Sequence, residues 1–177
     1  MSWMRLYHYI GPKSIAERTR PIPTGTAIRS AGDVRAWVRD SGQTLIAGCV
    51  IATFVINDSG LLLIADRRSE HVACAGGQPV RSAGEMTFDI GVVVEVIAVS
   101  NQSTGYCPEP TSWSAVDDAL SHAGFAVPKG FALACVFRRC VGCGGLNLVK
   151  EDVFECGRCR MELPERYNVQ DSWMESI

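Results

Sequence analysis

Cys140-Val141-Gly142-Cys143 and Cys156-Gly157-Arg158-Cys159 are the stretches that constrain the fold of this chain most strongly. Two residues separate the cysteines of each pair, so one tight turn can direct both thiols at the same point, and twelve residues separate the pairs. Structural zinc sites are closed tetrahedra that often use four thiolates. The spacing therefore predicts one structural Zn²⁺ held by Cys140, Cys143, Cys156 and Cys159.

Two disulfides are the alternative for four cysteines. Met1–Gly11 has no long apolar segment behind a basic head, so we expect no secretory signal and a reducing compartment. Paired Cys-x-x-Cys turns in such a chain favour a metal over disulfides. A catalytic zinc ion is also disfavoured, because four thiolates leave no open coordination position.

Apolar residues between the two cysteine pairs can form a short hairpin. They are Leu146, Leu148, Val149, Val153 and Phe154, with Lys150-Glu151-Asp152 at the expected tip. Together with the cysteines they resemble the zinc-ribbon superfamily over about Arg138 to Pro164. The resemblance implies a structural metal and, for many ribbons, contact with nucleic acid or protein.

Charge argues against a non-specific grip on nucleic acid. Residues 131–166 carry six Lys or Arg and five Asp or Glu, and four thiolates on one Zn²⁺ add two negative charges. Phosphate binding depends on neutralisation by Lys and Arg, and this segment has a slight negative excess. A protein partner is therefore favoured over a nucleic acid, although Arg138, Arg139, Arg158 and Arg160 can form a local basic patch.

Length and composition indicate one domain of ordinary size with a small appendage. The chain has 177 residues, 47% of them hydrophobic, and a net charge of −2. The longest uncharged apolar run, Thr44–Ile56, is too short for a membrane span. We expect a cytoplasmic protein with no membrane contact.

The order of predicted elements favours an α+β fold with a mostly antiparallel sheet, a few short helices and a C-terminal zinc-ribbon hairpin. Strands are expected over residues 5–10, 44–56, 61–65, 85–88, 92–99 and 131–137. Helices are expected over 12–17, after the capping residue Ser30, and over 113–123. The expected domains are an α+β body over 1–137, the ribbon over 138–165 and a tail over 166–177.

A first polar cluster, Asp66 to Cys74, follows an apolar strand. Arg67, Glu70 and His71 are candidate catalytic residues, because polar loops on a rigid sheet often carry sites. The alternative is a solvated turn. His71, Cys74 and Cys107 can also be combined into a second metal site, whereas Cys49 and Cys135 are expected to be ordinary buried thiols.

A second polar cluster follows the strand expected over 92–99. Its hydrogen-bonding side chains suggest ligand contacts, and the candidates are Asn101, Gln102, Ser103, Thr104 and Tyr106. The alternative is a loop whose side chains satisfy its own backbone, as Asn, Ser and Thr readily do.

Glu85 and His8 are the remaining catalytic candidates. Leu6-Tyr7-His8-Tyr9-Ile10, with the short helix that follows, resembles the first strand of some ADP-ribosyltransferase domains. The resemblance implies that His8 contacts the ribose of NAD, and Glu85 is a conceivable counterpart of the catalytic glutamate. Residues 69–74 and 101–110 resemble stretches of bacterial proteins without an assigned function, which implies no mechanism.

Two functions remain open from the sequence. The first is a zinc-binding recognition or accessory protein that presents a rigid surface to a protein partner. The second is an enzyme or small-ligand binder, such as a nucleotide binder, with a pocket where residues 67–74 and 101–107 converge.

Overall fold

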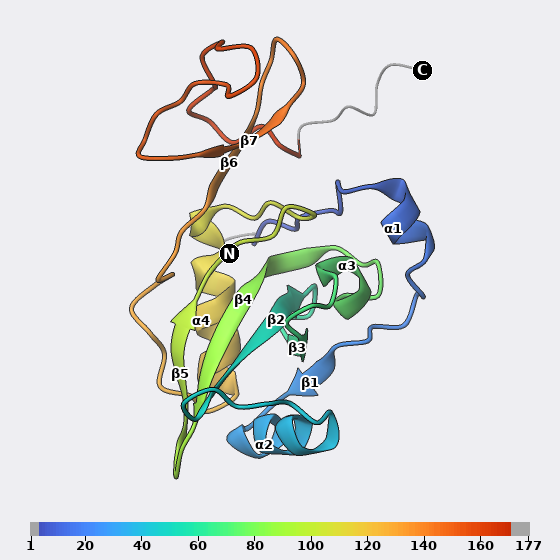
Figure 1. Cartoon of the computed structure of the whole chain (residues 1–177), viewed down its shortest axis with the longest axis vertical. Helices are drawn as coiled ribbons and strands as arrows, with labels where there is room; N and C mark the ends of the chain where they lie inside the picture. Colours follow the sequence, from blue (N-terminus) through green and yellow to red (C-terminus); the bar gives the residue numbers. More distant parts are fainter. Residues whose placement is uncertain (1–3, 171–177) are drawn as a thin grey trace. The chain divides into compact units, whose positions relative to one another are not determined.

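The computed structural model describes residues 4–170 and divides the chain into two compact units (Figure 1). Unit 1 comprises Met1–Ala134 and unit 2 comprises Cys135–Ile177.

Unit 1 is built on a five-stranded sheet. The strand order is β1–β3–β2–β4–β5, and each neighbouring pair is antiparallel. The strands are β1 (Thr26–Ile28), β2 (Cys49–Asn57), β3 (Leu62–Asp66), β4 (Val80–Ile90) and β5 (Val94–Val99). The expected α+β fold with a mostly antiparallel sheet is confirmed.

Short helices complete unit 1. They are α1 (Lys13–Glu17), α2 (Ala31–Asp40), α3 (His71–Cys74), η1 (Pro110–Ser112) and α4 (Trp113–His122). The expected cap of α2 is present, because Ser30 Oγ accepts a hydrogen bond from the Asp33 N–H at 3.3 Å. Gly124 ends α4 with a φ of +79°, a conformation that glycine adopts without strain.

One face of the sheet carries the main hydrophobic core. Val34 and Trp37 from α2 and Val116 and Leu120 from α4 pack against it. Every second residue of the central strands points into this core, namely Val50, Ala52, Phe54, Ile56, Leu62, Ile64, Met86 and Phe88. This alternation is what the period of two along a strand requires of a half-buried sheet.

The second face of the sheet is covered by α3 at one end of the strands. Val55, Leu63 and Ala83 are buried there, together with Val72 and Cys74 of α3. The Cys74 thiol donates to the Leu63 carbonyl oxygen at 3.8 Å, a long contact that sulfur permits. Figure 1 shows α3 and α4 on opposite sides of the sheet.

The expected strand over residues 5–10 is not formed. This segment makes one bridge, in which Tyr7 and Val80 exchange backbone hydrogen bonds of 2.7 and 3.0 Å. Three residues later the Ile10 N–H bonds to the Gly105 carbonyl instead. The backbone of this segment therefore changes its hydrogen-bonding partner between Tyr7 and Ile10. Its alternating aromatic pattern reflects burial of the Tyr7 ring, and the segment forms no continuous strand ladder.

The expected strand over residues 131–137 is also wrong. The Ala132 N–H bonds to the Val99 carbonyl at 2.9 Å, and the Phe131 ring packs edge-on against Trp113. The regular strand begins later, as β6 (Val136–Arg139), and belongs to unit 2. The strand expected over 92–99 begins at Val94 and exposes Glu95 to solvent.

We predict that Gly84→Ala destabilises unit 1 by about 1–3 kcal/mol or more. A Cβ at this position would overlap the backbone carbonyl oxygen of Ser100, because the chain leaving β5 passes directly over Gly84. Urea unfolding measures the change. Gly130→Ala is the control, since a Cβ there meets no atom within 4 Å; equal stability of both variants would contradict the close approach.

Candidate metal centre

The four predicted cysteines converge in unit 2. The thiol sulfurs of Cys140, Cys143, Cys156 and Cys159 all lie within 4.8 Å of one another. The Cys140–Cys159 and Cys143–Cys156 sulfur separations are 3.5 and 3.6 Å. A tetrahedron with Zn–S bonds of about 2.3 Å has edges of about 3.8 Å, whereas a disulfide bond is about 2.05 Å. The donor set and its spacing therefore fit a metal ion.

The strands β6 and β7 (Leu146–Val149) position the first cysteine pair. They form an antiparallel hairpin in which Arg139 faces Leu146, and the Cys140–Cys143 turn is its connection. The tip expected at Lys150-Glu151-Asp152 is a second turn, which a backbone bridge closes between Lys150 and Val153. The hairpin of unit 2 is therefore formed by β6 and β7, and the residues between the cysteine pairs supply only one of its strands.

The two cysteine turns repeat the same backbone geometry. In the first, the Cys140 N–H donates to Gly145 O and the Gly144 N–H donates to Cys140 O, both at 2.9 Å. In the second, the Cys156 N–H donates to Met161 O at 2.8 Å and the Arg160 N–H donates to Cys156 O at 2.9 Å. The fourth residue after each leading cysteine has a positive φ, which is +70° at Gly144 and +67° at Arg160.

Backbone N–H groups inside these turns favour thiolates. The N–H groups of Cys159 and Arg158 lower the pKa of the Cys156 thiol to about 6. The N–H of Cys143 likewise lowers the pKa of Cys140. A hydrogen bond to the charged form stabilises that form, so the leading cysteine of each turn is prepared to ligate a cation.

Asn147 links the two turns and was not identified from the sequence. Its Nδ2 donates to Gly145 O at 2.9 Å and to the Cys156 sulfur at 3.5 Å. Its Oδ1 accepts a hydrogen bond from the Gly157 N–H at 3.0 Å. The only sequence signal is a polar residue between Leu146 and Leu148, on the strand face that points at the cysteines.

Arg138 is a second structural residue that sequence reasoning missed, having been counted there only as a surface charge. It is buried, and its guanidinium donates to the carbonyl oxygens of Phe137, Pro164 and Glu165 at 2.6–3.1 Å. The rings of Phe154 and Tyr167 lie 5.9 Å from its guanidinium carbon. Arg138 therefore joins β6 to the segment after the second cysteine pair.

Residues after Glu165 continue this packing up to residue 170. Asn168 exchanges hydrogen bonds with the backbone of Arg139, at 2.9 and 2.7 Å, while Tyr167 and Val169 are buried. Tyr167 is therefore docked within unit 2. The rest of the expected tail, from residue 171 on, lies outside the described residues.

The proposed second metal site is not assembled. Among residues 4–170, the four-cysteine cluster is the one group of His, Cys, Asp or Glu suited to a metal. His71 Nε2 lies 2.9 Å from Gly84 O, the Cys74 thiol contacts Leu63 O, and the Cys107 thiol contacts Thr104 O. Burial raises the pKa of Cys74 to about 12, which keeps it a neutral thiol.

The first polar cluster, Asp66 to Cys74, contacts strand β4. Arg67 Nε bonds to Glu85 Oε1 at 3.0 Å, and Ser100 Oγ accepts a hydrogen bond from the Glu85 N–H at 3.3 Å. Burial lowers the pKa of His71, so its ring is neutral near pH 7 and donates to Gly84 O through Nε2. Glu70 is exposed. Arg67, His71 and Glu85 are therefore neighbours, but each is already engaged within the fold.

The second polar cluster largely satisfies itself. Asn101 Nδ2 donates to Pro108 O at 2.8 Å, Ser103 Oγ accepts from the Tyr106 N–H at 3.4 Å, and the Tyr106 hydroxyl donates to Gln78 O at 2.8 Å. Of the ligand-binding candidates, only Gln102 and Thr104 are exposed. These two remain predictions.

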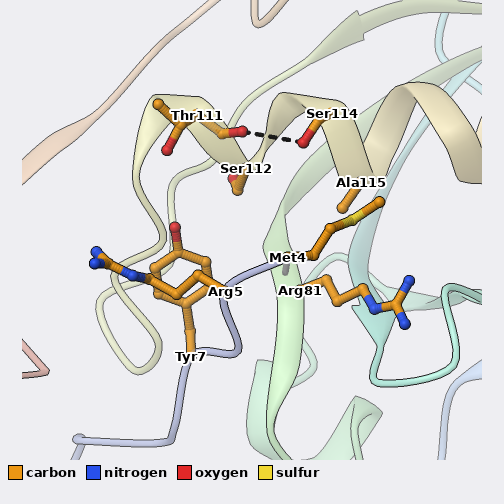
Figure 2. Close-up of a pocket in the computed structure, with 8 residues that line it drawn as sticks. All are labelled: Met4, Arg5, Tyr7, Arg81, Thr111, Ser112, Ser114 and Ala115. Atoms are coloured by element: carbon orange, nitrogen blue, oxygen red, sulfur yellow. Dashed lines mark hydrogen bonds between the residues drawn. The ribbon is translucent and has the colours of Figure 1, made fainter. Parts of the chain in front are cut away.

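His8 is not among the residues that line the hollow next to Glu85. His8 is exposed, next to the buried Tyr7. A hollow of about 200 Å³ adjoins Tyr7, Arg5 and Arg81 (Figure 2). Figure 2 shows the two guanidinium groups directed away from each other, and Arg5 pairs with Glu109 at 3.2 Å. The two guanidinium groups therefore do not form a concentrated positive charge in this hollow.

Comparison with known proteins yields no match among family models, curated proteins or solved structures. None of the helices within residues 4–170 combines the length and apolar composition needed to cross a bilayer.

We predict that Cys156→Ser abolishes retention of zinc. One zinc ion per chain is expected in the unaltered protein, and three thiolates with a hydroxyl hold it far less tightly. Elemental analysis after dialysis against a chelator measures the loss. Cys49→Ser is the matched control, because Cys49 lies outside the cluster; retention of zinc in both variants would contradict the assignment.

Arg138→Lys is expected to weaken unit 2 while leaving all four cysteines in place. A lysine has one ammonium group and cannot reproduce the fork of bonds to Pro164 and Glu165, so about 1.5–3 kcal/mol is lost. Faster zinc release to a chromogenic chelator reports the change. The exposed Arg166→Lys should release zinc at the unaltered rate, and equal rates in the two variants would exclude the role given to Arg138.

Proposed function

We propose that this chain is a zinc-binding recognition protein. One structural Zn²⁺ holds unit 2 together, and unit 2 presents a rigid apolar surface to a protein partner. The observation that carries the proposal is that a closed four-thiol site lies beside exposed aliphatic side chains. These are Val141, Leu146, Leu148, Val153 and Met161, which are 38–73% exposed.

The closed donor set supports a structural metal. Four thiolates complete a tetrahedral zinc ion and leave no position for water or substrate. Cys140 and Cys156 are buried and form the small core of unit 2 with Leu163. Metal binding therefore supplies folding energy to this unit.

The apolar surface gathers at the first cysteine turn. Met161 lies across Gly142, since a Cβ built on Gly142 would come 2.6 Å from the Met161 sulfur. Met161 therefore lies over the residue that follows Val141, which is 73% exposed. Exposed aliphatic groups on a rigid turn suit a protein interface, in which apolar anchors enter pockets of the partner.

Charge favours a protein over a nucleic acid. The Arg160 guanidinium pairs with Glu155 at 2.9 Å, and Arg138 is committed to carbonyl groups inside unit 2. Arg139 also donates through Nη1 to Gly144 O, so half of the six Lys and Arg of residues 131–166 are engaged within unit 2. This leaves fewer cations for phosphate groups, which dominate the affinity of nucleic-acid complexes.

Affinity purification with quantitative mass spectrometry tests the proposal. The tagged chain should enrich a partner protein from cells that naturally make it, and Val141→Lys with Met161→Lys should abolish the enrichment, because charged ammonium groups replace the apolar anchors. Lys150→Met is the control, since it alters an exposed residue outside this turn. Equal zinc content verifies folding of all variants. Enrichment that survives the double substitution, or that nuclease removes, would overturn the proposal.

A further inference from the structure

The second face of the unit 1 sheet is open at the end that α3 does not reach. Val55 and Thr53 on β2 are buried in two successive rows, and the third row is partly exposed. Val55, Leu63 and Ala83 are at most 5% exposed, and Thr53 in the next row is 1% exposed. The following row, Ile51–Thr87–Ala98, is partly exposed on all three strands, as the cross-strand register requires of neighbours on one face.

A trough crosses the strands along this open row. A hollow of about 820 Å³ lies between the start of β2, the loop before it and the end of β3, and a second of about 180 Å³ lies over β4 and β5. Both are lined by Ile51 and Thr87, so they adjoin. The row crosses three strands, β2, β4 and β5, and Arg67, which follows β3, lines the trough beyond β2; three spacings of about 4.8 Å make the trough about 14 Å long.

Aliphatic side chains stand at both ends of the trough. Ile46, on the loop before β2, is 80% exposed, and Leu133 at the opposite end is 54% exposed. Large exposed apolar groups around a hollow are typical of interaction surfaces. The floor between them is apolar or small, since it consists of Ile51, Thr87 and Ala98.

The adjoining row leaves two carboxylates without a cation. Asp89 and Glu95 face each other across β4 and β5, and none of the described residues 4–170 forms an ion pair with either. Like charges in directly opposite positions destabilise a sheet. At the other side of the trough the charges are balanced, because Arg67 pairs with Glu85 and Arg68 with Asp66. The surface therefore has an unneutralised negative excess beside an apolar floor.

We propose that this trough binds a cationic, aliphatic segment of a protein partner. Aliphatic side chains of that segment contact Ile51 and Ala98, and its Lys or Arg groups lie over Asp89 and Glu95. A cation there removes the repulsion between the two carboxylates, so binding and sheet stability are linked. This surface belongs to unit 1 and is independent of the surface proposed on unit 2.

The dimensions suit a short extended segment. At about 3.3 Å per residue, about four residues cross the trough. Alternate side chains of an extended segment point the same way, so two or three of them reach the floor. The Ile46 and Leu133 side chains flank the ends of such a segment.

Selection from a random peptide library tests the proposal with a defined probe. Displayed peptides of about twelve residues exceed the trough in length, and the immobilised full chain, loaded with zinc, is the target. We expect enriched peptides to combine Lys or Arg with Ile, Leu or Val. Glu95→Lys should weaken a selected synthetic peptide about fivefold or more, since it reverses one exposed charge next to the bound cation.

Matched variants separate this surface from others. Glu17→Lys makes the same charge change on an exposed residue of α1 and should leave the peptide affinity unaltered, whereas Ala98→Arg should block binding by filling the trough. Val141→Lys with Met161→Lys on unit 2 should also bind peptide normally, so failure of either proposal is recognised separately. The absence of enriched peptides, a preference for acidic ones, or equal affinity of Glu95→Lys and Glu17→Lys would overturn the proposal.

Discussion

Four converging sulfur atoms organise the part of unit 2 that lies around the two cysteine turns. Its buried cluster contains Cys140, Cys156 and Leu163, with Val149 and Phe154 packed against them. Two of the three buried members are metal-ligand candidates, so ligand and core are the same residues. Small domains with little apolar core generally need a metal or disulfides. The Arg138 guanidinium adds a second cross-link, which holds the later segment to β6 without metal.

Spacing alone predicted which four cysteines converge, because two residues between cysteines leave few backbone conformations. The supporting residues were not predictable in the same way. Arg160 takes the backbone conformation that Gly144 takes in the first turn, yet no local propensity of arginine indicates a positive φ. Asn147 can link the two cysteine turns only because the fold brings both turns next to it. Such a long-range contact cannot be read from a single sequence.

The sheet of unit 1 shows the same difference between local signals, which the sequence contains, and long-range contacts, which it does not. β-Rich runs predicted strands over 44–56 and 61–65, where β2 and β3 lie, and the Ser30 cap predicted where α2 begins, since both signals are local. Residues 5–10 have an equally good strand pattern. Their backbone groups, however, form hydrogen bonds with two different segments, at Val80 and at Gly105, so no regular strand forms. The polar clusters were also ambiguous from sequence, because Asn101 and Ser103 serve the loop itself, and only the tertiary structure shows this.

Polar side chains whose hydrogen bonds are satisfied within the fold can be distinguished from charged side chains that the fold leaves without an ion-pair partner among residues 4–170. Buried polar side chains such as Thr53 and Arg138 bond to backbone carbonyls, and His71 does so through its neutral ring, so these residues are explained by the fold. Asp89 and Glu95 are not explained in that way, since their register brings like charges together at the open end of a sheet face. A fold that retains such a repulsion, beside an uncovered apolar row, gains stability when a cation approaches. The same reasoning applies to Val141 on the first cysteine turn: it is 73% exposed, so it gains little from folding, and the proposed interface would cover it.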